Sequence, residues 1–281
     1  MQEFTDRVAV VTGGASGIGF GLASAFAAQR MKIVLADIEA PALSEAVGKL
    51  EAGGAEVLGV RTDVSDAEQV QRLADAAVDR FGAVHVLCNN AGVGAGGLSW
   101  EVPLDTWEWV LGVNLWGVIH GVRSFVPILM QQPEAHVVNT ASVAGLVAGP
   151  FMGPYNASKH AVVAISETLH HEMALMAPQV KVSVLCPGWV RTRIADSARN
   201  RPGADGPDPG GAASGFALAL QPLIDQGMAP DELALTVLDA IRAERFWILP
   251  HDDTEDFWRT FVNERAQSLV DRTNPAVRAP R

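Results

Sequence analysis

Two side chains suited to acid–base chemistry lie four residues apart in the chain. Tyr155 is the only tyrosine of the sequence, and Lys159 follows it. Residues i and i+4 share one face of a helix, so the phenol and the ammonium can meet. A phenol titrates near ~10, and a nearby positive charge favours the phenolate. The pair is a candidate general acid/base with its activator, although two such residues also share helix faces without any catalytic role.

A glycine-rich segment near the N-terminus indicates phosphate binding. The β-branched run at residues 8–11, expected as a buried parallel strand, continues into TGGASGIG at residues 12–19 and a helical run over 20–29. This order presents free backbone N–H groups and a positive helix end to a pyrophosphate. Glycines permit the tight turn and the close approach of the phosphate. The residues expected to contact the cofactor here are Gly13, Ser16, Gly17, Ile18 and Gly19.

Asp37 follows the second predicted strand, residues 32–36, and lies about 20 residues after the glycines. A carboxylate at this point binds both hydroxyls of an adenosine ribose and repels a phosphate on that ribose. The next three residues are Ile, Glu and Ala, none of them basic. NAD is therefore favoured over NADP as cofactor. The alternative is that Asp37 caps the helix that begins near residue 41.

Strands and helices alternate along the chain. Further strands are expected at residues 56–61, 84–88, 136–140 and 181–185, and helices at 41–52, 66–81, 104–130 and 155–176, with Ser65 as N-cap of the second of these. The alternation predicts one α/β domain with a doubly wound parallel sheet of about seven strands and right-handed crossovers. Ligands bind at the carboxyl ends of such strands. Asn114 is expected within the helix over 104–130, either as a satisfied core residue or as part of the site.

The composition changes after residue 193. Residues 201–215 are dominated by Gly, Pro, Ala and Asp, which predicts a flexible connection. Because it follows a strand end that faces the cofactor, we favour a substrate lid over 194–229 rather than a solvated linker. A helix at 230–243, a strand at 246–249 and a helix at 252–269 complete the single domain over 1–281, whose residues 7–193 form the cofactor and catalytic core.

Charge and cysteine usage exclude several classes of function. The net charge is −11 and no block of Lys and Arg occurs, which argues against nucleic acid and anionic membranes as partners. No apolar run is long enough to span a bilayer, and the N-terminus has no basic leader, so a cytoplasmic protein is expected. Cys88 and Cys186 lack metal-ligand spacing and are predicted to be buried in a reduced protein, with no metal site.

Taken together, the chain resembles the short-chain dehydrogenase/reductase family over residues 7–193, a family with a Rossmann-type fold. The matching motifs are TGGASGIG at 12–19, Asp37, Asp63 with Val64, NNAG at 89–92, Asn114, Ser142, YNASK at 155–159 and PGWVRT at 187–192. The resemblance implies NAD binding by these motifs, with Asp37 setting the preference. The cofactor contacts it implies beyond the glycine turn are Asp63, Val64, Asn90, Ala91, Gly92, Tyr155, Lys159, Pro187, Gly188, Val190 and Thr192.

The resemblance also implies a role for each catalytic residue. Tyr155 is the general acid/base on the substrate oxygen, and Lys159 lowers its pKa and holds the nicotinamide-ribose hydroxyls. Ser142 donates a hydrogen bond to the same oxygen, and Asn114 supports a water-linked proton relay from the lysine. Val190 and Thr192 hold the carboxamide side of the nicotinamide. A homodimer or homotetramer is expected, with a dimer formed through residues 104–130 and 155–176; the glycine-rich tail that many members use in tetramers is replaced here by an acidic helix.

The residues next to the catalytic oxygen site predict the substrate class. Val143, Phe151, Met152 and Trp189 are all apolar, which indicates a bulky apolar or aromatic small molecule in contact with Ser142, Val143, Phe151 and Trp189. Met152 could equally pack its loop against the sheet. The stretches ADIEA, TASV and FWIL are similar to family members that oxidise aryl secondary alcohols, including lignin-dimer carbinols. No arginine is obviously placed for a substrate carboxylate, and Arg191 and Arg193 are the candidates if one exists.

These observations predict an NAD-dependent oxidoreductase that interconverts a secondary alcohol and a ketone. Two alternatives remain at this point. One is a dinucleotide-binding regulatory protein without turnover, which the complete set of catalytic residues opposes. The other is a lyase or epimerase on the same fold, which would bind the cofactor without net formation of NADH.

Overall fold

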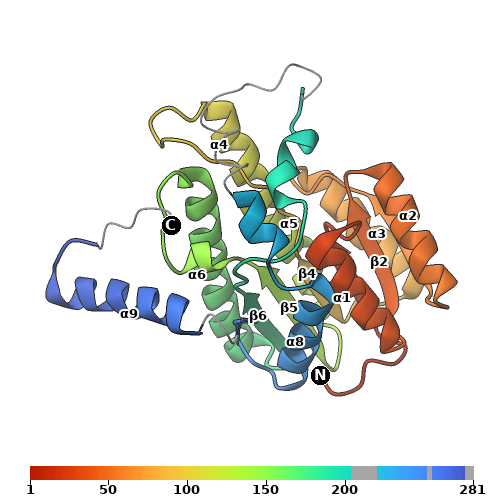
Figure 1. The fold of residues 1–281 in the computed structure, drawn as a ribbon. Coiled ribbons are helices and arrows are strands. Elements are labelled where there is room, and N and C mark those ends of the chain that lie inside the picture. Colours follow the sequence, from red (N-terminus) through yellow and green to blue (C-terminus); the bar gives the residue numbers. More distant parts are fainter. Residues whose placement is uncertain (204–219, 252–254, 276–281) are drawn as a thin grey trace.

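A computed structural model describes residues 1–203, 220–251 and 255–275 of the chain (Figure 1). Seven parallel strands form one sheet in the order β3-β2-β1-β4-β5-β6-β7. Their bounds are β1 Val8–Thr12, β2 Lys32–Asp37, β3 Val57–Arg61, β4 Val86–Asn89, β5 Ala135–Thr140, β6 Val180–Leu185 and β7 Trp247–Ile248. The predicted doubly wound parallel sheet is confirmed.

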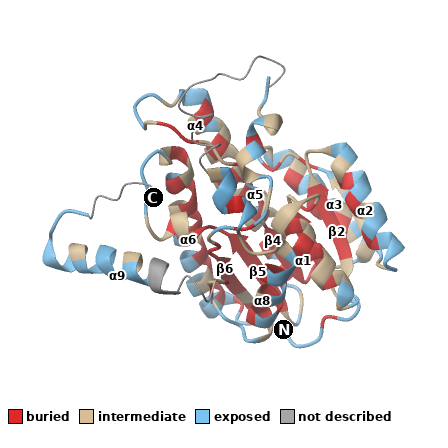
Figure 2. Ribbon diagram, in the orientation of Figure 1, coloured by how far each residue is buried: buried red, intermediate tan, exposed pale blue. Residues whose placement is uncertain are grey.

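Helices cover both faces of this sheet. Leu22, Leu43 and Leu233 place α1, α2 and α8 in one apolar cluster, and Leu73 and Leu169 belong to the cluster under α3, α5 and α6 on the opposite face. Figure 2 shows the buried residues gathered in the strands and on the inner sides of these helices. The helix bounds are α1 Gly17–Ala28, α2 Ala40–Ala52, α3 Ala67–Phe81, α4 Leu104–Leu111, α5 Gly117–Leu129, α6 Gly153–Met176, α8 Pro230–Arg242 and α9 Glu255–Asp271.

The central strands are buried along their whole length because both faces are covered. All five residues of β1 and all six of β5 are buried. Truncating one of the fully buried side chains, such as Phe26 or Leu185, would cost about 2–5 kcal/mol of unfolding free energy. Cys88 in β4 and Cys186 after β6 are buried free thiols, as predicted.

The strand order reverses at β1, which pairs with β2 on one side and with β4 on the other. Crossovers leave β1 and β4 toward opposite faces, so the loops after these strands separate at their carboxyl ends. The glycine turn follows β1, and the residues after Asn89 follow β4. This switch point is where the predicted cofactor residues converge.

The segment predicted as one helix over residues 104–130 is interrupted. A π-helical turn, Gly112–Trp116, separates α4 from α5, and Asn114 lies at its centre. The extra residue per turn is not visible in apolar periodicity, which is why the sequence suggested a continuous helix. Such turns occur frequently at functional sites.

Two further boundaries differ from expectation. The N-cap of α3 is Asp66, whose carboxylate accepts from the N–H groups of Glu68 and Gln69 at 2.9 and 3.2 Å. Ser65 instead donates its hydroxyl to Asp63 Oδ1 at 2.7 Å. The helix after the glycine turn begins at Gly17 rather than at residue 20, so the last glycines belong to its first turn.

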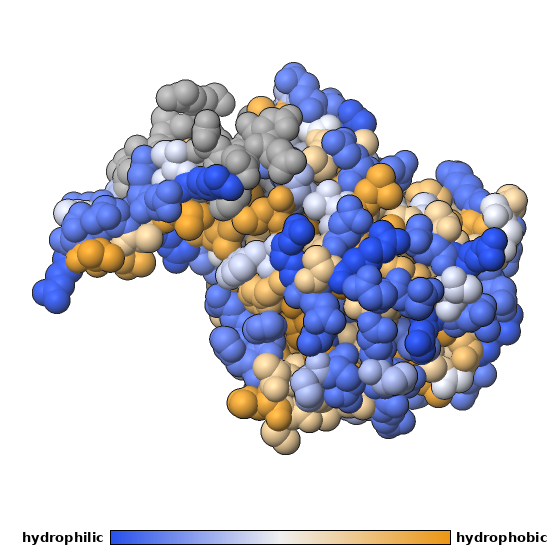
Figure 3. Space-filling model, turned by 90° about the horizontal axis from the view of Figure 1, so that it is seen from below, coloured by the Kyte–Doolittle hydropathy of each residue, from blue (hydrophilic) through white to orange (hydrophobic). Residues whose placement is uncertain are grey.

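The C-terminal part contains α8, β7 and α9. Helix α9 projects from the body (Figures 1 and 3), and the exposed Leu269 and Val270 contribute apolar surface to it. Arg265 Nη1 ties α9 to the body of the protein through the carbonyl of Leu146, at 2.5 Å, and His160 Nε2 of α6, at 2.9 Å.

Most of the stretch predicted as a flexible connection, residues 204–215, lies outside the described residues. Of the expected lid, the described parts are the 3₁₀ segment Ile194–Asn200, a helix over 220–225 and a bridge between Met228 and Val190. Within the described ranges, no helix has the length and apolar character needed to cross a bilayer. The same residues contain no group of three His, Cys, Asp or Glu that could hold a metal ion.

Candidate active site

Thr12, the last residue of β1, joins three strand ends at the carboxyl edge. Its Oγ1 accepts from the N–H groups of Asn90 and Ala91 at 2.9 and 3.1 Å. Asn90 Nδ2 donates to the carbonyl of Thr12 at 3.0 Å, and Asn90 Oδ1 accepts from Thr140 Oγ1 at 3.3 Å. Asn90 and Ala91 thus lie against the glycine turn as expected. The role of Thr12 was not predicted, although it opens the TGGASGIG motif.

The glycine turn is too tight for side chains at two positions. A Cβ on Gly13, where φ is +62°, would lie 2.8 Å from Ala91 Cα, and a Cβ on Gly19 would lie 2.1 Å from the carbonyl oxygen of Gly13. Ser16 is the N-cap of α1 but makes no side-chain hydrogen bond to the helix. The first N–H groups of α1 therefore have no capping side chain, and they fit the pyrophosphate of a dinucleotide.

Asp37 connects the end of β2 to the glycine turn. Its Oδ2 accepts from Ala15 N at 3.0 Å, and its Oδ1 accepts from Glu39 N at 3.0 Å. Burial raises the pKa of Asp37, and these backbone donors oppose the rise. The N-cap of α2 is Glu39, so the alternative reading of Asp37 as that cap is wrong. The carboxylate keeps further lone pairs that fit ribose hydroxyls.

Helix α6 carries the tyrosine–lysine pair. It begins at Gly153 with Pro154 in its first turn, where a missing N–H costs nothing. Lys159 Nζ lies 5.6 Å from the centroid of the Tyr155 ring and donates to the carbonyl of Thr140, at the end of β5, at 2.9 Å. Burial lowers the pKa of Lys159 to about 8. The ammonium is thereby fixed beside the phenol rather than in solvent.

Tyr155 and Ser142 interact at the same edge. Burial raises the pKa of Tyr155, and a hydrogen bond with Ser142 opposes that rise. This direction is opposite to the lowering expected from Lys159, because the loss of hydration on burial is the largest influence on this pKa. Ser142 Oγ also accepts from Ala144 N at 3.1 Å and donates to the carbonyl of Pro187 at 3.3 Å, so the hydroxyl is held between two loops.

Asn114 is a buried residue with three hydrogen bonds. Its Oδ1 accepts from Val93 N at 2.8 Å, while its Nδ2 donates to Val93 O at 3.0 Å and to Ser158 Oγ at 3.1 Å. Ser158 in turn donates to the carbonyl of Tyr155 at 2.7 Å. A Cβ on Gly92 would lie 3.5 Å from both Asn114 Oδ1 and Lys159 Nζ, so these two polar atoms flank one point. Asn114 is both satisfied and part of the catalytic cluster.

The residues predicted for the nicotinamide side follow β6. Val190 is buried and bridges to Met228, and Thr192 packs on the glycine turn, where a Cβ on Gly17 would lie 3.0 Å from Thr192 Cγ2. Pro187 accepts from Val143 N at 3.0 Å. Gly188 lies against the His251 ring. This strand end therefore meets the glycine turn and the catalytic loop.

The predicted substrate residues other than Ser142 present apolar surface. Phe151 and Trp189 are 40% and 39% exposed, and Val143 is half-buried. Phe151 has φ +63°, a strained conformation for a bulky residue. The bond from Gly97 N to Phe151 O, at 2.8 Å, holds it there.

Asp63 and Val64 lie at the end of β3, apart from the catalytic cluster. Asp63 Oδ1 accepts from Ser65 N at 2.9 Å, and Val64 O contacts His120 Nδ1 at 2.9 Å. The β3 edge is two strands from β1, which is consistent with the predicted place of these residues at the adenine end of a cofactor bound at the switch point.

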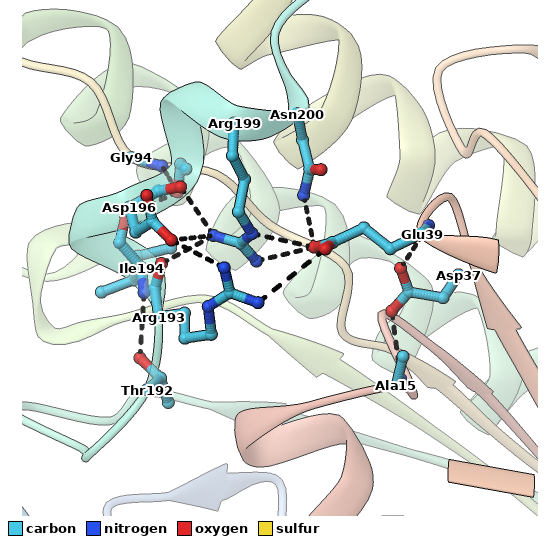
Figure 4. A network of polar contacts seen from close by, with 11 residues as sticks. Ala15, Asp37, Glu39, Gly94, Thr192, Arg193, Ile194, Asp196, Arg199 and Asn200 are labelled. Atoms are coloured by element: carbon cyan, nitrogen blue, oxygen red, sulfur yellow. Dashed lines mark hydrogen bonds and ion pairs between the residues drawn. The ribbon is translucent and has the colours of Figure 1, made fainter. Parts of the chain in front are cut away.

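Glu39 is the centre of a polar network that sequence reasoning missed (Figure 4). Its carboxylate contacts Arg199 Nη2 at 2.8 Å, Asn200 Nδ2 at 2.9 Å and Arg193 Nη1 at 3.8 Å. Partial burial opposes ionisation of Glu39, but the Asn200 and Arg199 contacts outweigh it, so its pKa lies below the ordinary value. Arg193, a candidate for binding a substrate carboxylate, contacts the carboxylates of Glu39 and Asp196 at 3.8 and 2.8 Å.

The parallel sheet with a glycine turn at its switch point defines a dinucleotide-binding α/β protein. The sequence model of the family described as short chain dehydrogenase matches residues 7–203. The chain belongs to this family of oxidoreductases. One solved structure, a short-chain dehydrogenase/reductase from Burkholderia phymatum in complex with NAD, is 46% identical with a TM-score of 0.95, and the match covers 100% of both chains.

Two characterised relatives carry dehydrogenase names. The 1-deoxy-11-beta-hydroxypentalenate dehydrogenase of Streptomyces exfoliatus is 37% identical over 264 residues, which are 90% of this chain and 89% of that protein. The C alpha-dehydrogenase of Sphingobium sp. strain SYK-6 is 32% identical over 277 residues, 98% of this chain and 89% of that protein. The second relative confirms the resemblance to carbinol dehydrogenases drawn from the sequence.

Proposed function

We propose that the protein is an NAD-dependent dehydrogenase that interconverts a secondary alcohol and a ketone, with Tyr155 as general acid/base. The observation that carries this proposal is the cluster of Tyr155, Lys159, Ser142 and Asn114 at the same sheet edge as the glycine turn. NAD, when bound, supplies the acceptor for the hydride that leaves the carbinol carbon.

The side chains divide the work on the substrate oxygen. In alcohol oxidation the ionised Tyr155 takes the hydroxyl proton, and Ser142 donates a hydrogen bond to that oxygen. The proton returns from the tyrosine in ketone reduction. Lys159 lies next to the phenol and favours its ionised form once the charge develops. The raised pKa of Tyr155 supports a rise in oxidation rate with increasing pH.

Cofactor preference follows from charge at the end of β2. Asp37 would bind the ribose hydroxyls and repel a phosphate there. The NAD-bound relative from Burkholderia phymatum supports this preference. The other cofactor contacts that we propose are the predicted ones; among them Gly13 lies against Asn90, and Gly17 lies against Thr192.

The substrate that we propose is a bulky apolar or aromatic secondary alcohol. The strained, part-exposed Phe151 and the exposed face of Trp189 support this class. The names of the pentalenate and C alpha-dehydrogenase relatives are consistent with it.

The experiment is formation of NADH by purified protein with NAD or NADP and a panel of aliphatic, cyclic and aryl secondary alcohols. We expect turnover of bulky aryl alcohols with NAD, and a loss of at least about 100-fold in kcat in Tyr155→Phe. Retention of turnover in Tyr155→Phe would refute the mechanism, and activity with NADP alone would refute the cofactor preference. Binding of NADH without turnover across the panel would favour the regulatory protein or the lyase and epimerase alternatives.

We further propose that residues 194–229 act as a substrate lid on the core formed by residues 7–193. We also propose that the protein is cytoplasmic and forms a homodimer or homotetramer. Exposed Trp116, Leu175 and Met176, on the turn before α5 and at the end of α6, support a subunit contact through these helices. Sedimentation equilibrium tests the assembly, and a monomer at micromolar concentration would contradict it.

A further inference from the structure

The adenosine end of the cofactor site contains two arginines whose charge is already neutralised. Segment Ile194–Asn200 reaches back from the end of β6 to β2, where Arg199 Nε and Nη2 contact Glu39 Oε1 at 2.9 and 2.8 Å. Arg193 Nη1 lies 3.8 Å from the other carboxylate oxygen. Figure 4 shows both guanidinium groups directed at Glu39, next to Asp37.

These arginines lie at the position where a ribose phosphate would have to bind. Glu39 donates its backbone N–H to Asp37, the residue proposed to bind the ribose. Arg193 also lines a cavity of about 200 Å³ together with Ala15 and Ser16 of the glycine turn. A phosphate on the ribose hydroxyl would therefore meet the Glu39–Arg193–Arg199 cluster, in which the carboxylates of Glu39 and Asp196 both contact the two guanidinium groups.

We propose that Glu39 is a specificity-determining residue: by neutralising Arg193 and Arg199 it prevents them from binding the 2′-phosphate of NADP. The inference rests on the proposed use of a nicotinamide dinucleotide and adds a second determinant to Asp37. Guanidinium groups bind phosphate well because their donors match its oxygens. With Glu39 in place, they are occupied and the phosphate faces a further negative charge. Without that charge, the same two arginines become a phosphate site.

The remaining contacts of the cluster should hold the segment Ile194–Asn200 in place when the charge of Glu39 is removed. Asn200 Nδ2 donates to Glu39 Oε1 at 2.9 Å, a bond that a glutamine oxygen accepts equally well. Within the segment, Arg199 Nη1 donates to the carbonyls of Asp196 and Arg193 at 2.7 and 3.1 Å, and Ser197 Oγ accepts from Gly94 N at 3.0 Å. Glu39→Gln therefore changes the charge at one point while the arginines keep their support.

The test measures binding of NADH and NADPH to the full-length protein by fluorescence titration, which does not depend on any alcohol being turned over. For Glu39→Gln we expect the affinity for NADPH relative to NADH to rise by about tenfold or more. The gain should shrink as salt increases, because the arginines are 22% and 53% exposed. The double variant Glu39→Gln with Arg199→Gln should lose most of the gain.

Asp196→Asn is the matched control. Asp196 contacts Arg193 and Arg199 at 2.8 and 3.7 Å, but its side chain is 58% exposed against 25% for Glu39, so solvent screens its charge more strongly. We expect a shift of less than about twofold in the ratio of affinities for this variant. Equal shifts in Asp196→Asn and Glu39→Gln, or an unchanged ratio in Glu39→Gln, would overturn the proposal. Absence of turnover with normal NADH binding refutes only the proposed reaction, whereas a wild-type protein that binds neither nucleotide refutes both.

Discussion

The two ends of the site are held by different kinds of interaction. At the catalytic end, Lys159 and Asn114 are 3% and 1% exposed and bind backbone groups of the loops and strands around them. At the adenosine end, Glu39 is held by guanidinium groups that solvent reaches. Buried polar contacts are costly to break, whereas exposed ion pairs contribute little to stability and are screened by salt. The side chains that position the reacting groups are thus part of the buried core. The charge at the adenosine end lies near the surface, so it can be changed without unfolding the protein.

The largest expected effect comes from breaking the buried end. Asn114→Ala removes the side chain that bonds the N–H and carbonyl of Val93 and that donates to the hydroxyl of Ser158, which keeps its bond to the carbonyl of Tyr155. We expect a loss of about 3 kcal/mol or more of unfolding free energy and a decrease of about 100-fold in kcat, because the turn of α6 below Tyr155 loses its support. Urea unfolding and steady-state kinetics measure the two effects.

Asn139→Ala provides the control for this substitution. Asn139 is a buried amide that accepts from Asn89 Nδ2 at 2.9 Å and donates to Ser166 Oγ at 3.0 Å. Neither of these hydrogen bonds involves Ser142, Tyr155 or Lys159. The variant should lose a similar amount of stability with kcat nearly unchanged. If kcat falls equally in the two variants, Asn114 contributes to activity only through the stability of the protein and does not position Tyr155.

An intermediate loss of stability is expected at low pH, because two buried histidines of the core are neutral in the folded protein. Burial lowers the pKa of His136 to about 3 and that of His85 to about 4. Both histidines stay neutral in the folded chain, whereas the unfolded chain takes up protons below about pH 6.5. The stabilisation from the neutral histidines is therefore fully present above that pH, and it is lost as the pH falls toward the pKa values of the folded chain. Protonation of His136 in the unfolded chain should lower the free energy of unfolding by about 2 kcal/mol at about pH 5, and that of His85, which is less deeply buried, by less.

The measurement compares urea unfolding at about pH 7 and about pH 5 in the wild type and in His136→Gln. The variant should lose roughly 2 kcal/mol less than the wild type between these conditions, whatever its stability at neutral pH. An equal loss in both proteins would show that His136 is not a source of the acid sensitivity.

The smallest effect is expected at the exposed end. Arg199→Gln removes the shorter of the two ion pairs with Glu39. We expect a loss of less than about 1 kcal/mol in unfolding free energy and an increase of about two- to fivefold in the KM for NAD, which about 0.5 M salt should reproduce in the wild type. A loss of stability as large as that of Asn114→Ala would contradict the distinction between the two ends.

Local patterns were enough to predict much of this architecture. β-branched runs, the glycine turn and the alternation of elements led to seven parallel strands with Asp37, Asn90, Ser142 and the Tyr155–Lys159 pair at one edge. These features depend on residues close in sequence, so periodicity and spacing reveal them. Thr12 was present in a recognised motif, but its bonds to the loop after β4 depend on strand pairing.

The interactions that could not be predicted all depend on distant residues or on burial. The π-helical turn at Asn114 reflects its bonds to Val93 and Ser158, which lie 21 and 44 residues away. The Glu39–Arg199 pair joins residues 160 apart. No local pattern indicates such a partner.

By itself, the sequence determined the order of strands and helices, the glycine turn and the helical spacing of Tyr155 and Lys159, since these depend on backbone preferences and on the periodicity of apolar residues. Tertiary structure alone decided the direction of the Tyr155 pKa shift and the neutralisation of Arg193 and Arg199. The pKa depends on how much water the fold removes from the phenol, and the neutralisation depends on a segment after β6 reaching the end of β2. Both follow from packing in three dimensions.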